Sequence, residues 1–474
     1  MQTRAAISLL LALTFCAQGA RADSLRDIYE MALENDAQLR SEQAQYRATL
    51  ETEKTARSAL LPQVTGSYDY TDNERISDQE NFSVDPATGQ IGVTPTTTRL
   101  DTKQYGYTFS LQQAIFDLPA WFTFQSGKEI TRQAEATFAA NQQNLILRVV
   151  EAYLEVLRTQ DNLEATRAQE RAFARQLEQT QQRFDVGLIA ITDVHEAEAA
   201  YDLARVNRIV DENNVNVALE RLSVLTGRQH GNLDILDEDF AIKQPEPLER
   251  SAWVEFALAN NFNLKAARYA EEAARQSAKA SRMAHAPTLR GSANYSDLET
   301  NGSLERTPST PFDASPDSQT ENTTFGLSLE VPLFSGGRVS AERRRAAQEF
   351  IGAREDRINL SRNTVTNARS LHMTVLSDVA RVAARRQSIV SSQSALDATQ
   401  AGYEVGTRNI VDVLNAQNTL FAAQRDYANS RYDYVLNMLR LKEQAGLLSP
   451  EDIYALDSAL EDPPAPTASG NSAR

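Results

Sequence analysis

The chain has a single cysteine among its 474 residues, and this residue, Cys16, lies in a segment that is expected to be removed. Residues 1–22 are typical of a secretory signal, with Arg4 as the positive start, Leu9–Leu13 as the apolar centre and Ala20–Ala22 as a small-x-small cleavage site. The mature chain would therefore have no cysteine. This excludes disulfide bonds and thiolate metal sites.

Long apolar runs are also missing from the sequence. No segment approaches the ~20 uninterrupted apolar residues of an α-helical membrane span, so any membrane crossing would have to use strands. Basic residues are fewer than acidic ones, 48 against 64. Because the signal contains two arginines and no acid, the net charge changes from −16 to −18 in the mature chain. Such an acidic protein is a poor nucleic-acid binder, and we expect no nucleic-acid partner.

Familiar catalytic patterns are absent as well. The histidines are scattered outside any H-E-x-x-H pattern, and the sequence has neither a G-x-S-x-G motif nor a phosphate-binding loop. Gly336-Gly337 stands between an expected strand and an expected helix, where two glycines indicate a bend. We therefore predict that the protein is not an enzyme and uses no metal and no cofactor. The histidines are His195, His230, His285 and His372.

The sequence does contain an internal repeat with an offset of ~220 residues. It predicts a first repeat over residues 23–240 (helix, β-hairpin, long helix, tip and return helix) and a second over residues 241–454. We expect the tail, residues 455–474, to be disordered. The recurring groups are Glu30, Ala32, Leu33, Asn35 and Leu39 with Glu255, Ala257, Leu258, Asn260 and Leu264; Pro62, Gly66, Ser67 and Tyr70 with Pro287, Gly291, Ser292 and Tyr295; and Phe184-Asp185-Val186-Gly187 with Tyr403-Glu404-Val405-Gly406.

Each repeat holds two segments in which apolar and polar residues alternate with a period of two, as in strands. Such a pattern, with aromatic residues on one face, suits a barrel wall in lipid, while a soluble sandwich with one buried face remains the alternative. The polar segments Asp72–Lys103 and Leu298–Asn322 predict long solvated loops between the strands. The alternating segments are Tyr105–Gln112 and Phe325–Val331, and less strongly Val64–Thr71 and Leu289–Ser296.

Between these strand pairs the chain has the pattern of very long helices. No proline interrupts it from Pro119 to Gly187, which allows a helix of ~65 residues and ~100 Å. This helix has two apolar seams, and two seams suit a helix with a neighbour on either side. A return helix from Val194 would end before Gly227, and a further helix would cover Ser251–Ala284. The seams are Leu145, Val149, Ala152, Val156 and Leu147, Val150, Leu154, Leu157.

The number of strands predicts an oligomer. Four strands cannot close a barrel, since the smallest spanning barrels use eight and an open edge in lipid leaves backbone groups without partners. Three copies would supply twelve strands, although the sequence by itself does not select that number. The alternative from another class is a soluble periplasmic coiled-coil scaffold or adaptor.

Two helix-connecting segments carry a resemblance to a known family. Arg183–Val194 and Gly402–Leu414 resemble the periplasmic tips of the TolC family of outer-membrane efflux and type I secretion channels, and the resemblance extends to about Tyr454. It implies a mainly α fold with a small membrane β part, in which antiparallel coiled-coil helices form a periplasmic tunnel and four strands per protomer contribute to a trimeric 12-stranded β-barrel. It further implies a homotrimer in contact with outer-membrane lipid, a periplasmic adaptor, and an inner-membrane efflux pump or ABC transporter. The cargo stays open.

The resemblance also implies a gate at the tips. Asp193 would accept hydrogen bonds from Arg408 and Tyr403 of a neighbouring coiled coil, forming a latch that closes the entrance. Asp412 matches the first aspartate of the family's double constriction ring, whereas Asn415 stands at the second position, so three carboxylates would replace six. Phe184, Gly187 and Gly406 are the predicted turn residues of the tips. The alternative reading is purely structural: Tyr403 and Gly406 only make the turn, and Asp193 and Asp412 cap the helices that follow.

Overall fold

The computed structural model describes residues 23–237, 239–309 and 315–461, so the expected signal and residues 462–474 lie outside the described residues. The chain divides into two compact units. We call them the helical unit (residues 23–47, 133–268 and 356–461) and the strand unit (residues 48–132 and 269–355). Four helices have residues in both units: α3 (Ala37–Ser58), α4 (Leu118–Asp185), α7 (Phe262–Arg282) and α8 (Arg338–Glu404).

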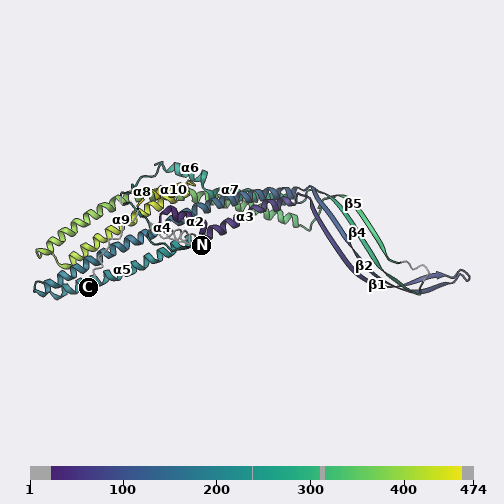
Figure 1. Ribbon diagram of the computed structural model, residues 1–474. Helices are drawn as coiled ribbons and strands as arrows, with labels where there is room; N and C mark the ends of the chain where they lie inside the picture. Colours follow the sequence, from purple (N-terminus) through teal and green to yellow (C-terminus); the bar gives the residue numbers. More distant parts are fainter. Residues whose placement is uncertain (1–22, 238, 310–314, 462–474) are drawn as a thin grey trace, which may run out of the picture. The chain divides into compact units, whose positions relative to one another are not determined.

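The strand unit contains a four-stranded antiparallel sheet in the order β1-β2-β4-β5 (Figure 1). Its strands are β1 (Gln63–Val84), β2 (Ile91–Phe116), β4 (Thr288–Thr307) and β5 (Ser318–Glu330). In this order β1 and β5 are the two edge strands. Each of them pairs with a neighbour on one side only.

One face of this sheet is apolar and the other is polar, as the alternation predicts. The register places Tyr70 opposite Tyr105, Phe109 opposite Tyr295 and Ala293 opposite Phe325. Because side chains alternate between faces along a strand, these residues share one face. The same face includes Val64, Tyr68, Tyr107, Leu111, Leu289, Leu327 and Leu329. Most of these side chains are exposed, Phe325 by 81% and Val64 by 69%, whereas Tyr105 and Leu289 are half-buried.

The predicted loops at Asp72–Lys103 and Leu298–Asn322 are wrong, because most of these residues continue the strands. The turn between β1 and β2 is confined to residues 85–90. Arg99 forms an ion pair with Glu74 at 2.5 Å, and Thr97 donates a hydrogen bond to Asp78 at 2.7 Å. Polar cross-strand pairs thus hold strands together where no apolar alternation marks them.

The helical unit is built on two long helical hairpins, α4–α5 and α8–α9 (Figure 1). The helices are α4 (Leu118–Asp185), α5 (Ile191–Thr226), α8 (Arg338–Glu404) and α9 (Ile410–Gln444). The first, with 68 residues, matches the predicted long helix. The predicted end of α5 is also confirmed, since Gly227 caps it in the left-handed conformation at φ 74°.

Both predicted seams of α4 are buried in one core. Leu145, Val149 and Val156 of the first seam and Val150 of the second are fully enclosed. They pack in a cluster with residues of α2 (Leu25–Asn35), α5, α6 (Arg250–Asn260), α9 and α10 (Pro450–Asp457). The phenol of Tyr153 lies in this core and donates a hydrogen bond to the Asp234 carbonyl at 2.7 Å, which satisfies its only polar group.

Two helix predictions need correction. The expected helix over Ser251–Ala284 is broken at Asn261 into two helices, α6 and α7 (Phe262–Arg282). The opening helix of the first repeat is broken at the equivalent position, Asp36, into α2 and α3 (Ala37–Ser58). The tail was predicted to be disordered from residue 455, which is too early in the chain. Helix α10 continues to Asp457, and β6 (Leu460–Glu461) pairs with β3 (Ile235–Leu236).

In the ranges that the structure describes, no helix combines the length and the apolar character needed to cross a membrane.

Candidate functional site

The first candidate site residues form a tight turn at the tip between α4 and α5. The amide of Gly187 donates to the Phe184 carbonyl at 2.8 Å, and the amide of Leu188 donates to the Arg183 carbonyl at 2.9 Å. This pair of bonds defines a Schellman cap, which needs a residue with positive φ at its centre. Gly187 provides it with φ 79°.

The tip between α8 and α9 repeats this geometry 219 residues later. Gly406 has φ 75°, and its amide donates to the Tyr403 carbonyl at 3.2 Å. The amide of Thr407 donates to the Gly402 carbonyl at 2.9 Å. The two tips therefore share one backbone design.

Tyr403 joins the two hairpins in a way that the sequence did not predict. Its ring packs beside Phe173 of α4 and Ile410 of α9, and the guanidinium carbon of Arg183 lies 4.8 Å from the ring centroid. A cation over an aromatic face at this distance is attracted by the ring. The Tyr403 hydroxyl is buried and has no hydrogen-bond partner among the residues that the structure describes.

Asp412 has a structural role in the first turn of α9. Its backbone amide donates to the Asn409 side chain at 2.9 Å, and its carboxylate accepts from the Asn409 amide at 3.4 Å, which forms a capping box. Arg408 lies on the same carboxylate, with Nη1 3.7 Å from Oδ2. Asn415, one turn further along, is exposed.

The three proposed latch residues are not joined within one chain. Arg408 pairs with Asp412 rather than with Asp193. Asp193 lies in the first turn of α5, where Ala190 is the N-cap residue and provides no side-chain cap. Among the described residues, the Asp193 carboxylate has no hydrogen bond or ion pair. Any latch of this kind would have to form between two copies of the chain.

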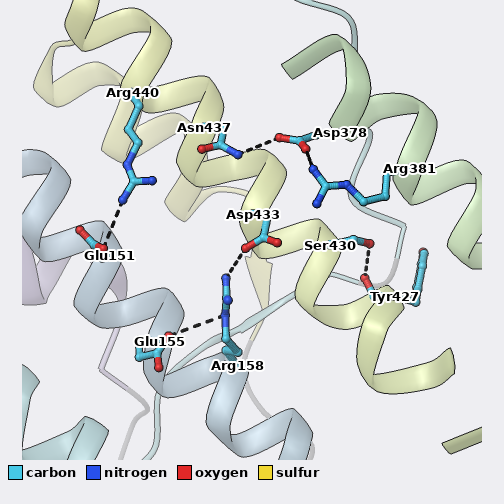
Figure 2. Close-up of polar contacts among 10 residues, drawn as sticks. All are labelled: Glu151, Glu155, Arg158, Asp378, Arg381, Tyr427, Ser430, Asp433, Asn437 and Arg440. Atoms are coloured by element: carbon cyan, nitrogen blue, oxygen red, sulfur yellow. Dashed lines mark hydrogen bonds and ion pairs between the residues drawn. The ribbon is translucent and has the colours of Figure 1, made fainter. Parts of the chain in front are cut away.

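Helix α9 also makes a series of polar contacts with both neighbouring helices (Figure 2). Toward α4, Asp433 accepts from Arg158 at 2.6 Å, and Arg440 lies 3.3 Å from Glu151. Toward α8, Asn437 donates at 2.8 Å to the buried carboxylate of Asp378, which also holds Arg381. These contacts hold α9 to α4 of the first hairpin and to α8 of its own hairpin. Charged residues on a helix give no pattern that would have singled them out from the sequence.

A half-buried acid, Asp161, extends this series. The Tyr432 hydroxyl donates to Asp161 of α4 at 2.6 Å. Burial raises the pKa of Asp161 above its usual value, although the hydrogen bond from Tyr432 opposes the shift. Burial likewise raises the pKa of Tyr432, so this phenol stays protonated as a donor. In the described part of the chain, no three histidine, cysteine or acidic residues gather as metal ligands would.

The family model described as "Outer membrane efflux protein" matches residues 28–228 and 253–447. The chain is 35% identical to the outer membrane protein TolC of Vibrio cholerae, over 93% of this chain and 94% of that protein. It is 30% identical to the alkaline protease secretion protein AprF of Pseudomonas aeruginosa, over 92% of this chain and 87% of that protein. Among solved structures, the outer membrane protein VceC of Vibrio cholerae superposes with a TM-score of 0.72 at 18% identity, covering 89% of this chain and 96% of VceC.

These matches cover both repeats and both long hairpins. They do not favour the alternative of a soluble periplasmic scaffold or adaptor. The chain therefore belongs to the outer membrane efflux protein family, as an outer-membrane exit duct of the TolC type for efflux and type I secretion.

Proposed function

We propose that three copies of the chain form one conduit, with a twelve-stranded barrel in the outer membrane and a helical tunnel in the periplasm. The free edges of β1 and β5 carry this proposal. In lipid, the unpaired backbone groups of two open edges would each cost several kcal/mol, so the edges must be paired with those of other copies. Joining β1 of one copy to β5 of the next closes the ring.

The apolar sheet face supports the membrane placement. On β1 it extends from Val64 to Tyr70, seven residues along the strand. At ~3.3 Å per residue this is ~23 Å, close to the ~25 Å apolar band of known outer-membrane barrels. Tyrosines gather toward one end of this band, at Tyr68, Tyr70, Tyr105 and Tyr107, as expected for residues at a membrane–water boundary.

An uncovered seam on α5 supports the tunnel. Leu203, Val206 and Val210 are exposed by 62%, 55% and 53%, and Val217 and Val224 continue the row at intervals of seven. A spacing of three, four and seven residues is that of a coiled-coil contact. Because no described part of the chain covers this row, a neighbouring copy is the partner that fits it.

The conduit would work with a periplasmic adaptor and with an inner-membrane efflux pump or ABC transporter. Cargo would be selected by that transporter, because a wide conduit has few specific contacts with what passes through it. The entrance would be closed by contacts between copies, with Asp193 of one copy accepting from Arg408 and Tyr403 of another. Among the described residues the Asp193 carboxylate has no partner and the Arg408 side chain is 60% exposed, so both are available for such contacts. The Tyr403 hydroxyl has no partner but is buried, so the Tyr403 side chain would have to turn outward to reach Asp193.

The assembly can be tested by native mass spectrometry of the protein extracted from outer membranes. We expect a trimer for the natural chain. Val206→Asp should weaken it, because assembly would bury three carboxylates without partners. Asn207→Asp adds the same charge one residue away from the seam and should leave the trimer intact. A stable monomer of the natural chain, or equal effects of the two substitutions, would contradict the proposal.

A further inference from the structure

We propose that a cationic groove between α7 and α8 binds the phosphate groups of anionic phospholipids at the periplasmic edge of the membrane. The groove has a volume of 440 Å³. This inference rests on the proposed membrane position of the sheet. The cationic groove is lined by Arg275, Ala278, Lys279, Arg282, Arg343, Arg344 and Ala347.

The cationic groove lies within the strand unit, next to the ends of two strands. Arg282 is the last residue of α7, and β4 begins six residues later at Thr288. Arg344 is only six residues into α8, or ~9 Å along the helix. Arginine side chains near a membrane edge can extend toward the headgroups while their stems remain on apolar surface.

Three of the five cations in the groove have no protein partner. Among the described residues, the guanidinium groups of Arg282, Arg343 and Arg344 make no hydrogen bond or ion pair, and the side chains of Arg343 and Arg344 are exposed. The neighbouring arginines of α8 differ, since Arg338 pairs with Glu342 at 3.1 Å and Arg345 with Glu349 at 3.4 Å. In a chain with net charge −16, a local excess of unpaired cations indicates an anionic ligand.

Aromatic side chains beside the groove indicate that this ligand belongs to a membrane. The Nζ of Lys279 lies 5.8 Å from the centroid of the Phe122 ring. The adjacent Trp121 is 47% exposed. Tryptophan with lysine or arginine beside it is the usual composition of a membrane interface.

Exposed apolar residues explain why a lipid fits better than free phosphate. Leu333 and Phe334 are 88% and 85% exposed, and they lie in the segment that joins β5 to α8. An anionic phospholipid could place its phosphate on the arginines while its acyl chains cover apolar surface near the sheet. Free phosphate would use only the charges.

The test is native mass spectrometry of the full chain in detergent, with phosphatidylglycerol or phosphatidylcholine of identical acyl chains. We expect the natural chain to retain phosphatidylglycerol preferentially. Each cation near a membrane surface is worth up to about fivefold in binding, so Arg343→Gln with Arg344→Gln should lower the preference about five- to twentyfold. The control pair Arg338→Gln with Arg345→Gln removes the same charge from the same helix and should change it less than about twofold.

Three outcomes would overturn the proposal. They are no preference in the natural chain, an equal loss in both double variants, and displacement of the lipid by millimolar inorganic phosphate, which would identify a site for free phosphate. The same spectra report the oligomer mass. A trimer that shows no lipid preference would contradict only the proposal that the cationic groove binds lipid. A monomer would contradict the proposed trimeric assembly.

Discussion

Asp36 and Asn261 occupy the same position in the two repeats, 225 residues apart, and each ends one helix and begins the next. The Asp36 carboxylate accepts from the Leu39 amide at 3.1 Å, and the Asn261 side chain accepts from the Leu264 amide at 2.9 Å. Their further partners differ. Asp36 binds Arg148 at 2.6 Å, whereas the Asn261 amide donates to the Gln444 carbonyl at 3.0 Å. One repeat therefore uses a charged contact where the other uses a neutral one.

The charged contact predicts an acid-sensitive stability. Burial would raise the pKa of Asp36, but hydrogen bonds from Arg148 and from the Leu39 amide outweigh it and hold the pKa below its usual value. A lowered folded pKa stabilises the protein above the unfolded pKa of about 3.9, and this contribution is lost as the pH falls through the folded pKa. Asp36→Asn keeps the cap and removes the charge, so it should cost about 1–3 kcal/mol at pH 7.

Denaturant unfolding at pH 7 and near pH 3 measures this difference. The loss in free energy of unfolding caused by Asp36→Asn should be smaller at the lower pH. Glu30→Gln is a suitable control, because the Glu30–Arg26 pair is exposed and solvent screening leaves it little effect on stability. Equal costs for Asp36→Asn at both pH values would show that the Asp36 charge is not used.

Asp161 predicts the opposite pH dependence. Its pKa is raised by burial, so the folded state binds a proton over a pH range where the unfolded state has released it. Stability therefore falls as the pH rises from about 4 through the folded pKa. Asp161→Asn retains an acceptor for Tyr432 and should raise the melting temperature more at pH 8 than at pH 4. A uniform loss of stability at both pH values would mean that the carboxylate itself is required.

The proposed latch predicts an unusual response of Tyr403. A buried hydroxyl without a partner costs about 1–3 kcal/mol, so Tyr403→Phe should not destabilise a chain in which the hydroxyl stays unbonded. In the proposed trimer, Asp193 of a neighbouring copy would accept from the Tyr403 hydroxyl and from Arg408. Removing both donors with Tyr403→Phe and Arg408→Ser should raise single-channel conductance without reducing trimer yield. Three copies of such contacts would bias the closed state by roughly 1–3 kcal/mol.

Tyr201→Phe is the matched control, since Tyr201 packs in the same cluster from α5. It should leave conductance unchanged. Unchanged conductance in the Tyr403 and Arg408 double variant would mean that packing between helices closes the entrance. Tyr403 and Arg408 would then have only a structural role in the turn.

The proposed constriction ring predicts cation selectivity that depends on Asp412. Its carboxylate also belongs to a capping box, so Asp412→Ala would remove both charge and cap. Asp412→Asn separates them, because it removes the charge but keeps an acceptor. Reversal potentials in a KCl gradient should show weaker cation preference for Asp412→Asn, and Asn415→Asp should strengthen block by divalent cations. Glu404→Gln, at the same tip, should have little effect, and an equal effect would place the ring elsewhere.

The limits of the long helices and their apolar seams were predictable from the sequence. The helix limits at Pro119 and Gly187 and the cap at Gly227 follow from residues whose backbone preferences differ from all others. Both seams of α4 were readable because each core contact repeats every three or four residues.

The remaining features depend on partners that are distant in the chain. In the outer halves of β1 and β2, polar stretches such as Asp72–Arg75 and Ser77–Asn81 interrupt the apolar alternation, so the sequence does not show that Asp72–Lys103 is mostly strand. The helix breaks at Asp36 and Asn261 were missed because neither position has a proline or glycine, and apolar residues recur at helical spacing on both sides of each break. Arg408 was assigned to Asp193 by resemblance, whereas in one chain the nearer carboxylate of Asp412 takes it.

The two tips share their backbone turns but differ in how the following helix begins. Asn409 closes a capping box at the start of α9, whereas Ala190 offers no side chain to α5. The first turn of α5 should therefore open more often, and its amides should exchange hydrogen faster than those of Ile410–Asp412. The proposed trimer would have six tips with the same backbone turn, and tips with a stable first helical turn would alternate with tips whose first turn opens more often. An adaptor that surrounds the six tips would then bind a surface with nearly sixfold shape but only threefold symmetry in its local stability.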